Sequence, residues 1–435
     1  MDAHGPVTIV AVVNPTSGGG QGGRIGAQLR QLLQHDNDLA SSFRIHDTTH
    51  RGDGVHLAEA WCRELWCAHQ QRPSAAWASD GPARRVLIVV GGDGTLSEVV
   101  NGIMHVVAAA EAANSDGAAS EPRGEGATHV VPDWVPDVAY IAAGTGSDFA
   151  RLGLCYANAE DCVRDLRRSA GGCRRQEVDV GRVVYLPQQV GHTNPDHHTT
   201  TAVTVPASPP PAPTSRDALV AANVPSRTER HFINVASVGL GSKVVTRAEN
   251  YKNSCISCCG GKAVFFAASF VELLSMTRVP LTIRPLAARG GVATSEGARH
   301  ADAAASPCSV DAADTHRNTI TTDATVVGFC NGQYFGGGMN IGPGASPSDG
   351  LLSMTVWRES LCGFLCGLPS VYNGKHRDWP STTCTNAVAF EVSSPTDGVR
   401  FEIDGEAGHE LPARVELSQW KVVLRAPGGA IGQAV

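Results

Sequence analysis

Two glycine-rich segments near the start of the chain suit the binding of a phosphate group. The first is NPTSGGGQGG (14–23) and the second is GGDGTLSE (91–98). Glycines let backbone N–H groups approach a phosphate closely, and a helix that begins just after them adds its N-terminus. The carboxylate of Asp93 would repel this phosphate unless a metal ion or a transferred proton balanced its charge. Asp93 is therefore predicted to be a Mg²⁺-linked or a catalytic acid.

Two later glycine-rich segments add further acids. GTGSDFARLG (144–153) contains Asp148 and Arg151, and Arg151 is expected either to reach a phosphate or to pair with Asp148. GGGMNIGPGASPSDG (336–350) ends on Asp349 and Gly350. An acid flanked by backbone carbonyls suits a hard cation, although PSDG is also an ordinary turn.

A last acidic segment, IDGEAG (403–408), places Asp404 and Glu406 on a turn after an expected strand. One carboxylate within hydrogen-bond reach of a hydroxyl group suffices as a general base, since positioning and metal charge supply most of the catalysis of phosphoryl transfer. Such a turn is also common as solvated surface. Asp93 is the competing candidate for the base.

These segments need a scaffold that brings them together, and residues 1–172 show a repeated strand, turn and helix pattern. The runs VTIVAVV (7–13), RVLIVV (85–90) and VAYIAAG (138–144) are typical of strands buried on both faces. The pattern predicts a doubly wound parallel α/β sheet. In such a sheet the turns at the carboxyl ends of the strands converge on one crevice.

Residues 173–413 consist mainly of strand-like segments with few helices between them. This pattern predicts a mainly β second domain with two packed sheets, a β-sandwich. Residues 414–435 are expected to return to the first domain. Low-complexity insertions are expected at 186–228 and 287–317, and a third at 112–130, because these stretches are poor in aromatic and large apolar residues.

In this order and at these positions, NPTSGGG, GGDGTLSEVVNG and GTGSDFARLG resemble the diacylglycerol kinase catalytic domain. The family includes bacterial lipid kinases, sphingosine kinases and ceramide kinases. The resemblance continues through EVDVGRV, NVASVGLGSKV, SPSDGLL and IDGE, and covers nearly the whole chain outside the insertions. GGDGT alone is shared with NAD kinases, so only the full ordered set indicates the lipid kinases.

The resemblance implies a function and residue roles. The chain would be an ATP-dependent lipid kinase that transfers the γ-phosphoryl group of Mg-ATP to a lipid hydroxyl, with diacylglycerol the first acceptor expected and a sphingoid base the second. Glu406 would be the proton acceptor, and Asp93 would organise metal and phosphate. Asp349, with the carbonyls of Ser346 and Leu351, would form a Mg²⁺ loop.

The residues that the resemblance places around ATP belong to the three glycine-rich turns of the first domain and to the end of its second strand. They are Asn14, Ser17, Gly18, Gly19, Gly20, Thr48, Gly91, Gly92, Asp93, Gly94, Thr95, Leu96, Ser97, Gly144, Thr145, Gly146 and Asp148. One neighbouring residue departs from the family pattern, because many members carry Asn where this chain has Ser147. Serine keeps a hydrogen-bonding side chain but lacks the amide.

The overall composition limits the partners. A net charge of −7 and a pI near 6.1 give no global basic field for nucleic acid. Thirteen scattered cysteines without a signal peptide favour a reduced, cytoplasmic compartment. The longest apolar run (263–276) is interrupted by Glu272 and too short to span a bilayer. Contact with the membrane lipid is therefore expected to be peripheral, and a homodimer stays open.

Three other functions were weighed. An NAD kinase would share GGDGT but leaves NPTSGGG and SPSDGLL unexplained. A catalytically silent lipid-binding homologue would not need Asp93, Asp148, Asp349 and Glu406. A dinucleotide-dependent dehydrogenase is suggested only by the G-x-G-x-x-G spacing within 18–23, and no hydride-transfer constellation accompanies it.

Overall fold

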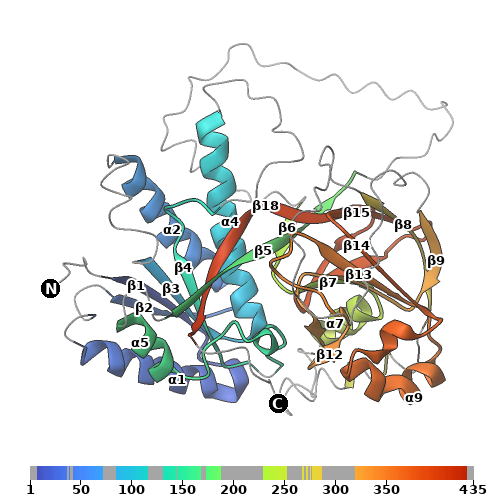
Figure 1. The fold of residues 1–435 in the computed structure, drawn as a ribbon, viewed down its shortest axis with the longest axis horizontal. Coiled ribbons are helices and arrows are strands. Elements are labelled where there is room, and N and C mark those ends of the chain that lie inside the picture. Colours follow the sequence, from blue (N-terminus) through green and yellow to red (C-terminus); the bar gives the residue numbers. More distant parts are fainter. Residues whose placement is uncertain are drawn as a thin grey trace, which may run out of the picture.

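The computed structural model describes most of the chain, namely residues 7–36, 39, 43–71, 85–115, 131–144, 146–167, 173–187, 229–251, 267–268, 271–272, 275, 277–286 and 319–428. The described residues form two lobes that lie side by side (Figure 1). The predicted insertions 186–228 and 287–317 lie outside this part of the chain apart from residues 186 and 187, and so does most of the apolar run 263–276.

The first lobe contains a parallel sheet with the strand order β2-β1-β3-β4. Successive residues of β1 point to opposite faces: Ile9 packs toward one pair of helices, α1 and α5, and Val10 toward the other pair, α2 and α4. Because helices cover both faces, the central strands are apolar throughout. The elements are β1 (Thr8–Val13), α1 (Ser17–Gln34), β2 (Phe43–Asp47), α2 (Asp53–Gln71), β3 (Arg85–Gly91), α4 (Asp93–Ser115), β4 (Asp137–Ala142), η3 (Phe149–Leu152) and α5 (Ala159–Arg167).

This arrangement confirms the doubly wound α/β prediction. One boundary differs, because α4 continues through Ser115 and so takes the first residues of the stretch expected to be an insertion, 112–130. The Ala-rich end of α4 explains the difference, since alanine has the highest helix propensity of all residues.

Two long strands connect the lobes, β5 (Cys173–Tyr185) and β18 (Ala413–Pro427). They pair antiparallel to each other, and the end of β18 also pairs parallel to β4 through Leu424 and Val138. In Figure 1, β18 runs from the sheet of the first lobe into the second lobe. The chain thus returns to the first sheet through β18, while the exact domain boundaries, 1–172 and 173–413, stay predictions.

The second lobe is a sandwich of two sheets, as predicted. One layer extends the large sheet through β18-β15-β8-β9 together with β5 and β6, and the other has the order β14-β13-β10-β7-β16-β17. Phe329, Phe390 and Phe401 are fully buried between the layers. The strands are β6 (Glu229–Phe232), β7 (Val235–Gly239), β8 (Val279–Leu286), β9 (Ile320–Ala324), β10 (Val326–Cys330), β13 (Leu352–Trp357), β14 (Thr382–Ala387), β15 (Ala389–Ser393), β16 (Arg400–Ile403) and β17 (Glu406–Glu410).

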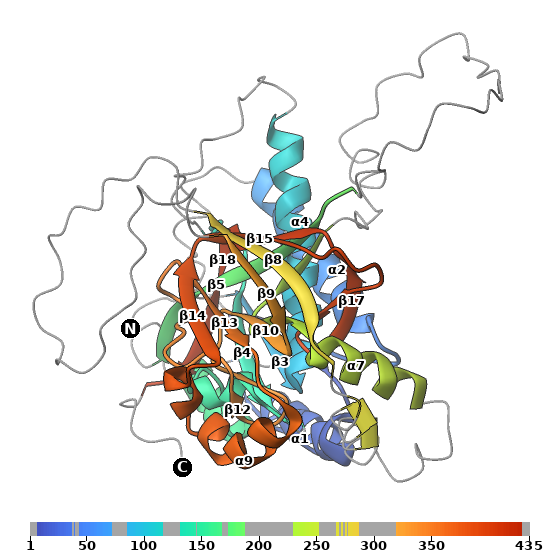
Figure 2. The same ribbon diagram turned by 90° about the vertical axis from the view of Figure 1, so that its right-hand side faces the viewer.

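A few further elements decorate the sandwich. The helix α7 (Leu240–Tyr251) follows β7, and α9 (Leu361–Tyr372) with η6 (Lys375–Asp378) lies at the periphery of the second lobe (Figure 2). A short hairpin of β11 (Tyr334–Phe335) and β12 (Met339–Asn340) lies between α9 and the first lobe. None of the described helices is long and apolar enough to cross a membrane.

Candidate active site

The three glycine-rich turns of the first lobe meet at one edge of its sheet. They follow β1, β3 and β4, which are adjacent parallel strands. The Asn14 side-chain amide donates to Thr95 Oγ1 at 3.2 Å, and Ala143 N–H donates to Gly91 O at 2.7 Å. The convergence expected from the strand and helix pattern is therefore present.

Two glycines make this meeting possible. Gly18 has a φ of +57°, and a methyl group there would collide with Ala143 O. A methyl group on Gly144 would likewise collide with Gly92 Cα. Larger residues would push the turns apart, so glycine is required where backbone touches backbone.

Asp93 connects the turn after β3 to the turn after β4. Its carboxylate accepts the N–H of Asp148 at 2.6 Å, the N–H of Phe149 at 3.3 Å and the hydroxyl of Tyr140 at 3.2 Å. Burial raises the pKa of Asp93 to about 6, and the charge of Asp148 adds to the rise, while the N–H of Asp148 opposes it. Asp93 is thus an acid that titrates near neutral pH and holds two turns together.

Asp148 connects the first lobe to the β11–β12 hairpin of the second. One carboxylate oxygen accepts the N–H of Gly337 at 2.9 Å, and the other lies 3.6 Å from Arg151 Nε. Burial raises the pKa of Asp148, and the N–H of Gly337 opposes that rise. Of the two roles expected for Arg151, the structure shows the pairing with Asp148.

The IDGE turn enters the site from the second lobe, where it joins β16 to β17. Asp404 has a φ of +48°, and its carboxylate accepts three backbone N–H groups at 2.9 to 3.1 Å. The donors belong to consecutive residues of the β6–β7 turn: Ile233, Asn234 and Val235. Asp404 thus links this turn to the β6–β7 turn, while Gly405 between Asp404 and Glu406 is exposed.

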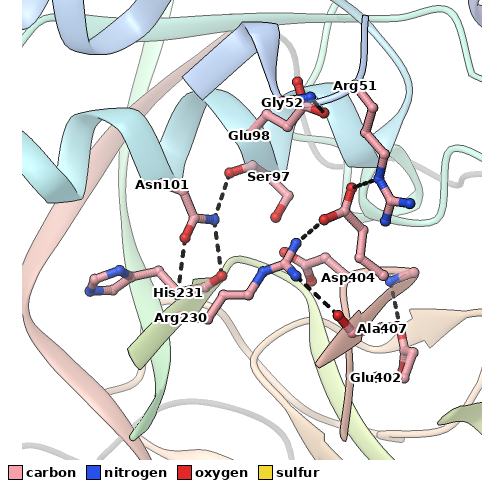
Figure 3. Close-up of polar contacts among 12 residues, drawn as sticks. Arg51, Gly52, Ser97, Glu98, Asn101, Arg230, His231, Glu402, Asp404 and Ala407 are labelled. Carbon is pink, nitrogen blue, oxygen red and sulfur yellow. Dashed lines mark hydrogen bonds and ion pairs between the residues drawn. The ribbon is translucent and has the colours of Figure 1, made fainter. Parts of the chain in front are cut away.

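The first and second lobes touch at this turn. The Ser97 hydroxyl on α4 lies beside the Asp404 carboxylate and helps to offset the rise in the pKa of Asp404 that burial causes (Figure 3). The charge of Asp404 in turn contributes to the raised pKa of Asp93. The GGDGT turn and the IDGE turn therefore face each other across the junction.

Glu406 lies at the same junction between two arginines, one from each lobe. Its carboxylate pairs with Arg51 Nε at 3.0 Å and, through the other oxygen, with Arg230 (Figure 3). Arg51 precedes α2, and Gly52 N–H beside it donates to Glu98 on α4 at 2.8 Å. The Glu406 carboxylate is thus held by one cation from each lobe.

Glu402 completes the set of acids around the turn. It is buried and accepts the Ser237 hydroxyl at 2.5 Å and the N–H of Gly405. Burial raises the pKa of Glu402 to about 7, against these donors, and the charge of Asp404 adds to the rise. The carboxyl groups of Glu402 and Asp404 shape the turn, and Glu406 is the acid of this turn that pairs with an arginine of the first lobe.

The predicted Mg²⁺ loop lies elsewhere, beside β5. Asp349 Oδ1 accepts the N–H of Leu351 at 3.0 Å, and the buried Asp179 accepts the N–H of Gly350 at 2.9 Å and pairs with Lys421 at 2.9 Å. Partial burial of the carboxyl group raises the pKa of Asp349, and the charge of Asp179 adds to the rise. Two carboxylates near backbone carbonyls are a donor set that fits a hard cation.

The loop alone supplies few side-chain ligands. Within the described residues, no three His, Cys, Asp or Glu side chains gather as a metal site. A cation there would depend on Asp349 and on backbone carbonyls such as those of Ser346 and Leu351. The Mg²⁺ assignment to these three residues stays a prediction.

The other residues predicted around ATP occupy the same edge of the sheet. Ser17 Oγ donates to Asn14 O at 2.8 Å, and Thr48 N–H donates to Val13 O at 2.7 Å. Leu96 is fully buried in the core, so only its backbone is available to a ligand. Gly94 is the second residue of α4, Gly146 precedes Ser147, and Thr145 lies outside the described residues.

Sequence reasoning missed the residues that connect the lobes. Arg51 and Arg230 lie outside the glycine-rich motifs. Each pairs with Glu406, from which it is separated by 176 or more positions in the sequence. Asp179 lies in EVDVGRV, which was used for the family resemblance but given no role. The signal for Asp179 was an acid in the middle of an otherwise apolar strand.

A doubly wound sheet whose glycine-rich turns face a β-sandwich defines a two-domain protein of the NAD kinase and diacylglycerol kinase fold. Two family models match the chain: the diacylglycerol kinase catalytic domain at residues 8–183, and the YegS C-terminal NAD kinase beta sandwich-like domain at residues 299–424. Residues 8–183 thus match a diacylglycerol kinase catalytic domain, and residues 299–424 match the β-sandwich-like domain.

Curated relatives match a short stretch of the chain, and solved structures share its fold. The diacylglycerol kinases of Mycobacterium tuberculosis strains CDC 1551 and H37Rv are each 33% identical over 97 residues, which is 22% of this chain and 31% of the relative. The match thus spans less than a third of these relatives. Crystal structures of a proposed diacylglycerol kinase from Bacillus anthracis strain Sterne have a similar fold, with TM-scores of 0.53 and 0.51 at 16% identity. They cover 96% of this chain and 97% and 96% of the Bacillus chains.

Proposed function

We propose that this protein is an ATP-dependent lipid kinase that transfers the γ-phosphoryl group of Mg-ATP to a hydroxyl group of a membrane lipid. Diacylglycerol is the first candidate acceptor and a sphingoid base the second. The observation that carries the proposal is that Glu406 of the IDGE turn pairs with Arg51 of the first lobe at 3.0 Å, next to Gly52, which donates to Glu98 of the GGDGTLSE segment at 2.8 Å. Phosphoryl transfer needs a phosphate-binding edge and a base in one place, and we assign the edge to the glycine-rich turns and the base to Glu406.

The glycine-rich turns would bind the nucleotide. Gly19 and Gly20 have left-handed φ angles with open space around them, so the backbone there is accessible to a phosphate. The N-terminus of α4, at Asp93 and Gly94, adds a helix end that favours anions. A bound Mg²⁺ would neutralise part of the phosphate charge, with Asp93 as the nearest acid to hold it.

Glu406 would accept the proton of the lipid hydroxyl. In the structure both of its oxygens pair with arginines, so the base is oriented but occupied. An incoming phosphate offers Arg51, which is half exposed, a competing anion that can also form a bidentate pair. Transfer of Arg51 from Glu406 to the phosphate would free one carboxylate oxygen for the hydroxyl group and bring a cation to the transferring group.

The test is transfer of labelled phosphate from Mg·[γ-³²P]ATP to a panel of acceptors in mixed micelles. The panel contains diacylglycerol, ceramide and sphingosine, with NAD in solution as a separate acceptor. Label in one lipid is the result expected. Label in NAD would replace the lipid assignment with the NAD kinase reaction, and a folded protein that binds ATP but labels nothing would be a silent homologue.

A further inference from the structure

The helix α9 presents an apolar face that nothing in the described part of the chain covers. Its sequence, LCGFLCGLPSVY, contains no charged residue. Phe364 and Val371 are buried and pack with Trp357 and Met339, so one face of the helix belongs to the lobe. A helix at the surface of a water-soluble lobe normally carries polar residues on its other face.

The outward face of α9 is formed by Cys362, Leu365, Cys366, Pro369 and Tyr372, all of which are exposed. Their spacing of three or four residues places them on one side of the helix. The side chains of Leu365 and Tyr372 are 50% and 46% exposed. The described residues contain one other exposed large apolar side chain, Leu186, and it is remote from α9 in the sequence.

Charged residues gather at both ends of this face. Arg358 and Glu359 precede the helix, Arg278 donates to Arg358 O at 2.7 Å, and η6 follows with Lys375, Arg377 and Asp378. The Arg358 guanidinium donates to Thr322 and Thr383, and Glu359 accepts the Ser381 hydroxyl. This leaves three cations, Arg278, Lys375 and Arg377, against the carboxylate of Asp378 at the two ends of the face. A locally positive margin around an apolar helix, in a chain with a net charge of −7, is complementary to an anionic lipid surface.

The position of α9 suits a protein that acts on a bilayer. The helix packs on β12, next to the hairpin whose Gly337 N–H is held by Asp148 of the first lobe (Figure 2). A membrane in contact with α9 would thus lie on the side of the second lobe where the hairpin contacts the glycine-rich turns of the first lobe. A free protein partner would explain the apolar face equally well, but would not explain its cationic margin.

We propose that the α9 face, Cys362, Leu365, Cys366, Pro369 and Tyr372, docks on an anionic phospholipid bilayer. The proposal rests on the lipid kinase function only in that this function explains why the protein would bind a membrane. The predicted binding itself follows from the side chains on and beside α9. The apolar side chains enter the boundary between headgroups and acyl chains, while Lys375 and Arg377 stay at the headgroups. The acceptor lipid then reaches the site without leaving the membrane.

Sedimentation with vesicles tests the docking surface directly. The vesicles consist of phosphatidylcholine, with or without phosphatidylglycerol, and contain neither diacylglycerol nor ATP. We expect Leu365→Glu to weaken binding by about tenfold or more, since it puts a charge where an apolar side chain would enter the bilayer. Leu186→Glu is the matched control at an equally apolar, exposed position and should bind as the wild type does.

The charge argument has its own variant. Lys375→Gln with Arg377→Gln should weaken binding to the vesicles that contain phosphatidylglycerol and leave binding to pure phosphatidylcholine unchanged. Circular dichroism melting shows whether each variant is folded, which is expected because the altered side chains are at the surface. Equal binding of the wild type and Leu365→Glu, or no binding of the wild type to either vesicle, would overturn the proposal.

Activity on a water-soluble acceptor separates this proposal from the proposed function. Leu365→Glu should phosphorylate a monomeric short-chain diacylglycerol at the wild-type rate and lose activity only on vesicles. Vesicle binding that depends on Leu365, without phosphorylation of any lipid, would leave the docking surface and remove the kinase assignment. A monomeric wild type in analytical ultracentrifugation is expected, and a dimer dispersed by Leu365→Glu would assign the face to a second copy instead.

Discussion

Among the single residues of the site, Ser147 adopts an unfavourable backbone conformation. It has a φ of +46°, a conformation that costs most L-residues roughly 1–2 kcal/mol, and its hydroxyl donates to Gly144 O at 3.1 Å. Asparagine tolerates this conformation better than serine. The departure from the family pattern therefore places a less suited residue in a strained position.

We expect Ser147→Asn to raise the free energy of unfolding by about 1 kcal/mol because it relieves that strain. Urea unfolding measures the change. Ser147→Val is the control, since a β-branched residue is the least suited to positive φ, and it should lower the midpoint. Equal midpoints for all three proteins would show that the turn is not strained.

We expect the ionised carboxylate of Asp93 to lower the free energy of unfolding at neutral pH. Its folded pKa of about 6 lies above the ordinary value of 3.8, so the folded state holds the proton more tightly than the unfolded state. Ionised Asp93 therefore costs up to about 3 kcal/mol above pH 6, and the cost disappears as the pH falls below 4. Asp93→Asn should raise the melting temperature at pH 7.5 and lose the gain toward pH 4, while it abolishes phosphoryl transfer. A melting temperature lowered equally at both pH values would contradict this.

At the scale of elements, the IDGE turn acts as a clamp. Asp404 satisfies three N–H groups of the β6–β7 turn, which otherwise would be buried without partners. We expect Asp404→Ala to lower the free energy of unfolding by more than about 3 kcal/mol. Asp397→Ala, at an exposed acid in a nearby turn, should change it by less than about 0.5 kcal/mol. Similar unfolding curves for the two variants would refute the clamp.

The arrangement of elements was largely accessible from the sequence. Apolar runs at 7–13, 85–90 and 138–144 and the glycines after them predicted a parallel sheet and the convergence of its turns, because both depend on local pattern. The roles of Asp404 and Asp148 were not accessible, since their partners at 233–235 and 337 lie far away in the sequence. Which donors a carboxylate meets across two lobes depends on packing, and no local spacing encodes it.

At the scale of the whole molecule, we expect the proposed phosphoryl transfer to depend on how the lobes meet. Gly337 has a φ of +89°, and its N–H is the group that Asp148 holds across the junction. Gly398 has a φ of +76° in an exposed turn, and both glycines have open space around them. They are matched in backbone strain and differ in the contact between the lobes.

Gly337→Ala and Gly398→Ala should each lower the free energy of unfolding by about 1–2 kcal/mol, because alanine disfavours positive φ. We expect only Gly337→Ala to lower kcat/KM for phosphoryl transfer, by about tenfold or more, since it displaces the N–H that orients Asp148. Unfolding curves and steady-state kinetics on the two variants measure this. Equal kcat/KM values would show that the hairpin does not position the site.

The central claim is that the lobe junction transfers phosphate from ATP to a lipid hydroxyl with Glu406 as the base. The most direct measurement is the rate of label transfer from [γ-³²P]ATP to the best acceptor lipid by the wild type, Glu406→Gln and Glu410→Gln. Glu410 lies on the same strand, pairs with Arg400 and is more exposed. We predict a loss of about a hundredfold or more in kcat for Glu406→Gln alone. Equal rates for all three proteins would contradict the account.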